Sequence, residues 1–266
     1  MPFTFDEILA DARKRAGIVG AGPIKVAVIA GQSHAAPRAT SVGIVAPYGD
    51  QTSIPIYWNL NDLVTRQTTT IDFVAPISSR HGTEVRLARD LAAKGYNAIL
   101  LAARGATSLA DSGTPDTHWA PGVVGSRYAQ MLTRKTTLET ELVKRTLGVT
   151  GVTYGTFIWI QGTGDAGPAS EAWANAYQAN EAALVAQVRA DFGAGIQFVS
   201  PLTNPLHDPG WPFGATIRAA KAANAVAISN YVTVSEVGIP LADPDGIHYD
   251  SAGYLELARR IAAVVT

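Results

Sequence analysis

The sequence predicts a three-layer α/β sandwich, in which helices cover both faces of a parallel sheet of about five strands. Two observations lead to this class. Short apolar, mostly β-branched runs alternate along the chain with longer amphipathic segments, which is the pattern of βαβ units. The runs are apolar almost throughout, as in strands covered on both faces. Of the 266 residues, 47% are hydrophobic and 16% are charged, so the chain can bury a sizeable core.

Four clear strands and a weaker fifth are predicted. The clear runs are residues 24–30, 98–103, 156–160 and 196–200, and the weaker run is 231–237. Apolar residues at helical spacing predict helices between the strands. These helices span residues 83–94, 126–147, 171–192 and 214–229, and they are followed by a last helix that Ser251 is expected to cap.

Two regions interrupt the alternation. Residues 1–22 are predicted to form a helical arm that ends at a Gly-Pro break and could pack on a neighbouring copy in a homo-oligomer. Residues 34–80 form a long insertion with two expected strand pieces, at 54–58 and 69–74. Insertions of this length are usually functional or carry a small sheet of their own. The sequence shows no repeat and no low-complexity linker, so residues 23–266 are predicted to be one domain.

Charge and composition exclude several classes of function. The formal net charge is −1 and no Lys/Arg-rich run occurs, so nothing indicates nucleic-acid binding. No apolar stretch approaches the ~20 residues that cross a bilayer, and the first residues lack the pattern of a secretory signal. The compartment stays open between the cytoplasm and a larger extracellular or viral assembly. With no cysteine and no ligand spacing among the histidines, we expect no metal and no organic cofactor.

Polar clusters that contain glycine follow the predicted strands, where open α/β sheets bind their ligands. They are Gly-Gln-Ser-His at 31–34, Arg-Gly-Ala-Thr-Ser at 104–108 and Gln-Gly-Thr-Gly-Asp at 161–165. A fourth cluster, Asp-Pro-Asp-Gly-Ile-His at 243–248, comes just before the last helix. Because the carboxyl ends of parallel strands share one edge of the sheet, we expect the clusters to meet in a single active site.

Within these clusters, Ser33 and His248 form the best nucleophile and base. A serine attacks only when a base removes its proton. His248 is the best candidate base, because Asp245 lies three residues earlier and could fix its tautomer. Taken singly, Ser33 could equally be a loop cap, and Asp-x-x-His is often an ordinary surface loop. The hypothesis therefore depends on the clusters occurring together.

Taken in order, the blocks resemble those of the SGNH (GDSL-like) hydrolase superfamily. The matching residues are Gly-Gln-Ser at 31–33, Gly82, Trp-Ile-Gln-Gly-x-x-Asp at 159–165 and Asp-Gly-Ile-His-Tyr at 245–249. The most similar branch is that of the sialate O-acetylesterases and acetylxylan esterases, whose Gly-Gly-Thr-Ser-Leu…Trp segment resembles residues 104–109 and Trp119. The resemblance covers roughly residues 24–262 and implies a flavodoxin-like SGNH hydrolase fold.

The resemblance also implies roles for individual residues. Ser33 would attack an ester carbonyl, and His248 would accept its proton and return it to the leaving alcohol. The oxyanion would be held by the backbone N–H groups of Ser33 and Gly82 and by the side-chain amide of Gln161. One such donor contributes about 3–4 kcal/mol. From the residues alone, Gly82 could equally begin a helix, and Gln161 could be a buried amide that satisfies loop backbone.

Three departures from the family pattern concern the substrate side of the site. The family's Asn after the serine is His34 here, its Glu in the third block is Thr163, and its Gly-Gly is Gly105-Ala106. Since Thr163 carries no charge, Asp245 is the predicted partner of His248. Asp165 is expected mainly to tie its loop to backbone N–H groups. The residues predicted to line the substrate pocket are Gln32, His34, Ser108, Trp119 and Asp165.

The predicted function is therefore a serine esterase that removes O-acetyl groups from a carbohydrate or glycan. Two alternatives stay open. The same serine and oxyanion hole would serve an O-acyltransferase. A glycan-binding or structural module on a hydrolase scaffold would need no catalysis, but the intact Ser33, Asp245 and His248 argue against it.

Overall fold

The computed structural model describes residues 22–37, 39–40, 54, 56–58, 80–145, 149–241 and 246–266. The predicted N-terminal arm, apart from Gly22, and the strand piece at 69–74 lie outside the described residues. Asp245 does as well. The homo-oligomer contact through the arm therefore stays a prediction.

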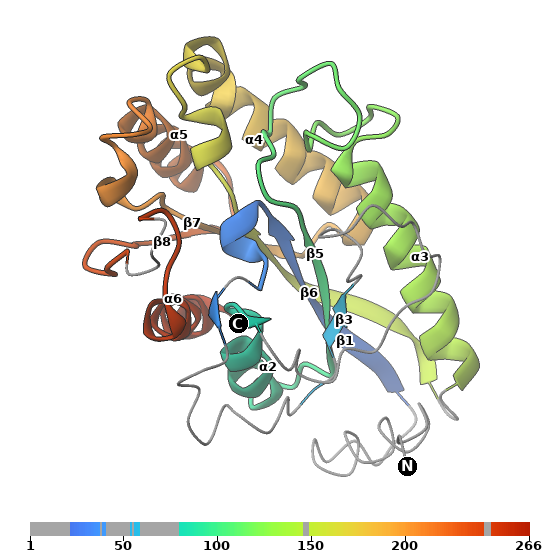
Figure 1. Ribbon diagram of the computed structural model, residues 1–266. Coiled ribbons are helices and arrows are strands. Elements are labelled where there is room, and N and C mark those ends of the chain that lie inside the picture. The colour runs from blue at the N-terminus through green and yellow to red at the C-terminus, as the bar shows by residue number, and fades with distance from the viewer. Residues whose placement is uncertain are drawn as a thin grey trace.

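A parallel sheet forms the centre of the molecule (Figure 1). Within the described residues it has six strands, which in spatial order are β3 (Ile56–Trp58), β5 (Ala98–Ala103), β1 (Gly22–Gly31), β6 (Val149–Ile160), β7 (Gln197–Pro201) and β8 (Tyr231–Val234). All neighbouring pairs are parallel. The five predicted strands are confirmed, and the sixth, β3, comes from the strand piece expected at 54–58. A second, two-stranded antiparallel sheet joins β2 (Ala39–Thr40) to β4 (Arg80–His81).

The strand order makes the end of β1 a topological switch point. With the short edge strand β3 set aside and the other strands numbered along the chain, their spatial order across the sheet is 2-1-3-4-5, which is the flavodoxin-like order. From β1 the chain moves to β5 on one side, and then crosses to β6 on the other. At such a switch point the connections leave in opposite directions, and the space between them is where α/β sheets bind ligands.

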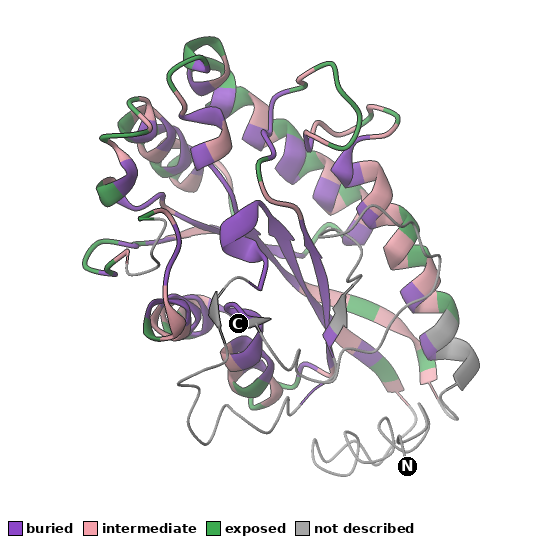
Figure 2. Cartoon of the chain, in the orientation of Figure 1, coloured by how far each residue is buried: buried purple, intermediate pink, exposed green. Residues whose placement is uncertain are grey.

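Helices cover both faces of the sheet, so the predicted three-layer sandwich is confirmed (Figures 1 and 2). The helices α3 (Arg127–Arg145), α4 (Glu171–Phe192) and α5 (Gly214–Ala227) pack on one face. The helices α2 (Glu84–Ala92) and α6 (Ser251–Val264) pack on the other. Each helix buries its inward residues and exposes its outer face (Figure 2).

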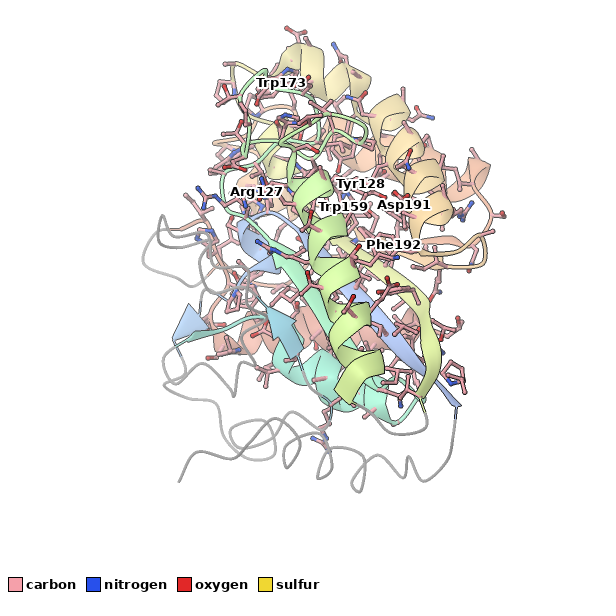
Figure 3. The ribbon with its side chains drawn as sticks, turned by 90° about the vertical axis from the view of Figure 1, so that its right-hand side faces the viewer. Arg127, Tyr128, Trp159, Trp173, Asp191 and Phe192 are labelled. Atoms are coloured by element: carbon pink, nitrogen blue, oxygen red, sulfur yellow. The ribbon has the colours of Figure 1, made fainter. Side chains whose placement is uncertain are left out.

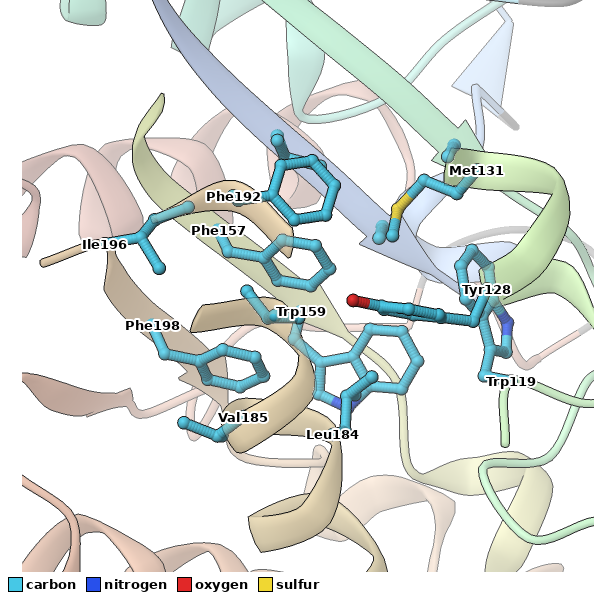
Figure 4. Close-up of a cluster of buried hydrophobic side chains, with 14 of the residues drawn as sticks. Trp119, Tyr128, Met131, Phe157, Trp159, Leu184, Val185, Phe192, Ile196 and Phe198 are labelled. Atoms are coloured by element: carbon cyan, nitrogen blue, oxygen red, sulfur yellow. The ribbon is translucent and has the colours of Figure 1, made fainter. Parts of the chain in front are cut away.

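Side chains of β1 alternate between the two cores. Val26 and Val28 point to the α3–α4–α5 layer, whereas Ala27 and Ile29 point to the α2–α6 layer. The larger core is rich in aromatic rings (Figure 4), and Phe157 and Phe198 stack at a centroid distance of 5.4 Å. At its rim the Tyr128 hydroxyl of α3 donates to Asp191 Oδ2 of α4 at 2.7 Å (Figure 3). These contacts hold the strand ends in place on that side.

The cap of the last helix differs from the prediction. Asp250, not Ser251, caps α6, because its Oδ1 accepts the backbone N–H of Gly253 at 2.8 Å. The Ser251 hydroxyl instead contacts His81 Nε2 at 2.7 Å. Aspartate and serine are both favoured caps, but α6 begins at Ser251, so Asp250 holds the N-cap position.

Candidate active site

The turn after β1 lifts Ser33 out of the sheet. Gly31 has a φ of +140°, and a Cβ there would lie 2.1 Å from the carbonyl oxygen of Ile160, so only glycine fits. The Gln32 N–H donates to the same oxygen at 3.0 Å, which joins the ends of β1 and β6. The chain then enters a short 3₁₀ turn, η1 (Ser33–Ala35), of which Ser33 is the first residue. The nucleophile candidate therefore sits at the switch point.

Gln32 locks this turn onto the loop after β6. Its Oε1 accepts the Gly164 N–H at 2.9 Å, while its Nε2 donates to the Thr163 hydroxyl and lies 3.3 Å from His34 Nδ1. Thr163 stands where the related esterases carry Glu, and its hydroxyl contacts an amide instead of supplying a charge to the base. Gln32 is thus a residue that orders the site.

His248 lies beside the Ser33 turn, although the two segments are far apart in the sequence. The ring of His34, the residue after Ser33, is 5.1 Å from the ring of His248 and 5.5 Å from that of Tyr249, measured between centroids. His248 is 8% exposed, so its imidazole is largely screened from solvent. The expected meeting of the nucleophile and base segments is present. Asp245 lies outside the described residues, so its partnership with His248 stays a prediction.

Gly82 lies against the Ser33 turn, but its N–H already has an acceptor. A Cβ at Gly82 would be 3.0 Å from the Ala36 carbonyl oxygen, which places this glycine beside the end of η1. Its N–H donates to Glu84 Oε1 at 2.9 Å. Glu84 is buried at the first position of α2, and no described residue hydrogen-bonds its Oε2. The Gly82 N–H, which was predicted to donate to the oxyanion, therefore donates to the Glu84 carboxyl group in this structure.

Glu84→Gln should remove part of the pH dependence of stability. Burial raises the pKa of Glu84 from 4.5 to about 7, so between these values the folded protein keeps a proton that the unfolded chain has released. The free energy of unfolding therefore falls as pH rises through this window. Glutamine does not titrate, so the variant's stability lacks this pH dependence. We therefore expect the melting temperature of Glu84→Gln, relative to that of the wild type, to be about 5 °C higher at about pH 8 than at about pH 5.

Thermal melts across this pH range measure the effect. Glu171→Gln, at an exposed glutamate that begins α4, is the matched control and should track the wild type at every pH. A constant gap between Glu84→Gln and the wild type would contradict the titration of Glu84.

Gln161 and Asp165 form a buried hydrogen-bonded unit behind the turn. Gln161 Nε2 donates to Asp165 Oδ2 at 2.6 Å and to the Thr107 carbonyl at 3.2 Å, and its Oε1 accepts the Tyr177 hydroxyl at 2.8 Å. Asp165 also accepts the N–H groups of Leu109 and Ala110, which ties its loop to the one after β5. Asp165 is 0% exposed, and its hydrogen bonds join two loops; its place in the substrate pocket stays a prediction.

Two other predicted pocket residues are also structural. Trp119 is 1% exposed, packs edge-on against Trp159 at 5.2 Å and donates its Nε1–H to the Thr107 hydroxyl. Its ring therefore offers no face to a sugar. Ser108 is buried, and its hydroxyl donates to the Ala110 carbonyl at 2.7 Å. Both residues belong to the segment that resembles the family's Gly-Gly-Thr-Ser-Leu…Trp block, and in the structure their polar atoms bond to neighbouring loop residues.

A buried lysine, which the sequence analysis did not single out, joins the ends of β6 and β7. Lys221 Nζ donates to the carbonyls of Gln161 and Pro201 at 2.6 and 2.7 Å. Burial lowers the pKa of this lysine, and the charges of Glu181, Glu236 and Asp165 oppose the shift. It lies in an alanine-rich helix, so nothing local in the sequence marks it. Its contacts fix the strand ends that carry the site.

The ordered motifs and this geometry agree with a comparison against protein families. A family model described as "Carbohydrate esterase, sialic acid-specific acetylesterase" matches residues 23–266. The chain belongs to this family. None of the curated proteins compared with the esterase matches it in sequence.

Several solved structures share the fold of this esterase. NanS is 14% identical, with 92% of this chain and 97% of that chain covered and a TM-score of 0.66. A protein from Arabidopsis thaliana is 18% identical, with coverages of 91% and 97% and a TM-score of 0.62. A carbohydrate acetylesterase from Xanthomonas citri is 18% identical, with coverages of 89% and 55% and a TM-score of 0.60. At these identities the likeness shows the fold.

The described part of the esterase offers no metal centre and no membrane span. No group of three or more His, Asp or Glu among the described residues could hold a metal ion. None of the described helices is both long and apolar enough to cross a bilayer.

Proposed function

We propose that this esterase removes O-acetyl groups from a carbohydrate or glycan through a Ser33–His248–Asp245 triad. One observation carries the proposal: the turn that begins with Ser33 and the segment that ends with His248 meet through the His34 ring, 5.1 Å from His248. The meeting lies at the switch point of the sheet, where this fold class binds its ligands. The family description supports acetylated carbohydrate as the substrate class.

The proposed reaction passes through an acetyl-enzyme. Ser33 Oγ attacks the acetyl carbonyl while His248 takes its proton, and the tetrahedral intermediate then expels the sugar alkoxide, which His248 protonates. Water attacks the acetyl-serine with His248 as base again, and acetate leaves. Asp245 would hold the imidazole in the required tautomer and stabilise the imidazolium.

For the oxyanion we propose the backbone N–H groups of Ser33 and Gly82 as the main donors. The Gly82 N–H becomes available when the Glu84 carboxyl releases it, and the developing oxyanion is the acceptor that would replace the carboxylate. Gln161 would add a third donor only after giving up its contact with Asp165 or Thr107. Of these two, the 3.2 Å contact with Thr107 is the longer and the easier to exchange.

Acetate release from a panel of glycans tests this function. We expect free acetate from an O-acetylated sialic acid, acetylated xylan or an O-acetylated bacterial polysaccharide, with kcat/KM at least about tenfold above that for a chromogenic acetate ester, because remote binding contributes to the transition state. Acetyl groups appearing on a second sugar without free acetate would point to a transferase. Glycan binding without loss of acetyl groups would point to a binding module.

A further inference from the structure

Three of the five histidines of the chain gather around one peptide group. The His34 ring lies 5.0 Å from that of His207 and 5.1 Å from that of His248. They come from three separate segments: η1, the 3₁₀ turn η4 (Pro205–His207) after β7, and the approach to α6. His34 is 4% exposed and His207 is 3% exposed. Most buried polar atoms of side chains have at least one hydrogen-bond partner, so the partners of these ring nitrogens show what the cluster holds.

Two of these rings bind the same atom. His34 Nε2 lies 3.0 Å from the Ile247 carbonyl oxygen, and His207 Nε2 lies 2.8 Å from it. A carbonyl oxygen has two lone pairs and no proton, so each ring must carry its hydrogen on Nε2 and donate it. Ile247 directly precedes His248. The two donors therefore hold the peptide group from which the base extends.

The surroundings fix this protonation state. The Gly164 N–H donates to Gln32 Oε1, so the amide group of Gln32 must face His34, whose Nδ1 is the acceptor at 3.3 Å. No described residue hydrogen-bonds His207 Nδ1, which is buried. Burial is the main cause that lowers the pKa of His207, helped by His248 and Arg218 and opposed by its contact with Ile247 and by Asp208. His207 is therefore a neutral imidazole with its hydrogen on Nε2.

We propose that His207, together with His34, is a positioning residue for the base: the two imidazole N–H groups clamp the Ile247 carbonyl and set the place of His248 relative to Ser33. This inference rests on the proposed function. The clamp holds the backbone of His248, whereas Asp245 would orient its ring, so the two devices are separate. It also gives a role to His34, where the related esterases carry Asn.

Substitutions at His207 test the clamp without touching the residue beside the nucleophile. Glutamine can place its Nε2–H near that of the imidazole, whereas methionine fills a similar volume against Trp211, whose ring is 5.8 Å away, without a donor. We expect His207→Met to lower kcat about 10- to 100-fold with KM nearly unchanged, because small misplacements of reacting groups have effects of this size. His207→Gln should return kcat to within about fivefold of the wild type, since the donor is restored.

Hydrogen exchange supplies a readout that does not depend on activity. The backbone of residues 246–250 should exchange at least about tenfold faster in His207→Met than in the wild type or in His207→Gln. If both variants lose turnover equally, or neither does, the clamp is wrong. If the wild type hydrolyses no ester, the proposed function fails, and exchange alone decides: an unchanged rate in His207→Met overturns the clamp, and a faster rate supports it.

Discussion

Ser33→Ala is expected to lower the turnover of a chromogenic acetate ester by roughly 10⁴- to 10⁶-fold, as loss of the nucleophile does in serine hydrolases. The fold should be kept, because Ser33 begins a turn whose hydrogen bonds are made by backbone atoms: the Ala36 N–H donates to the Ser33 carbonyl at 3.1 Å. A steady-state assay with the purified protein, together with its melting temperature, measures both effects.

A fluorophosphonate probe identifies the nucleophile directly. It should add one covalent label to the wild type, and that label should disappear in Ser33→Ala. Ser170→Ala is the matched control, since Ser170 is also buried at the start of a helical segment but makes no capping hydrogen bond with its side chain. A label on any serine other than Ser33, or normal turnover in Ser33→Ala, would contradict the assignment.

The second large effect separates the roles predicted for Asp245 and Asp165. Asp245→Asn should lower kcat by roughly 10²- to 10⁴-fold with the fold intact, because an Asn in this role favours the wrong imidazole tautomer; the matching change in a serine protease costs about 10⁴-fold. Turnover and thermal melts of the same preparation measure it.

Asp165→Asn should act on stability instead. Asp165 is fully buried and accepts three N–H groups, so an amide in its place turns one acceptor into a donor that faces other donors. The cost is about 2–4 kcal/mol, and the melting temperature should fall by about 5–15 °C. A well-folded Asp165→Asn without turnover, beside an active Asp245→Asn, would reverse the two roles.

The elements that the sequence predicted well are those set by local pattern. The run at 98–103 became a strand with the predicted bounds because continuous apolar residues suit a sheet covered on both faces. Of the weaker run at 231–237, only Tyr231–Val234 is a strand, since the polar Ser-Glu that follows does not continue the apolar pattern. The helix over 171–192 was predicted with its bounds because helical spacing and Gly193 mark its course and its end. A strand piece was predicted at 54–58. The three residues that form it, Ile56–Trp58, carry no pattern that indicates pairing with β5 in the main sheet.

His207 has a signal in the sequence: Asn204-Pro-Leu-His207 follows the fourth predicted strand as the other polar clusters follow theirs. The atom that His207 binds, the Ile247 carbonyl oxygen, has no such signal, because the two residues meet only after β7 and the approach to α6 are packed together.

By itself the sequence determined the fold class and the order of the strands' polar ends, and it predicted Ser33 and His248 as nucleophile and base, because periodicity and position after a strand are properties of short segments. Tertiary structure alone decided how each polar group is used. It made Trp119 a core residue, occupied the N–H of Gly82 with Glu84 and directed two histidines to one carbonyl. The physical reason is that a hydrogen bond requires two groups within about 3 Å, and for segments far apart in the chain only the packed fold sets that distance.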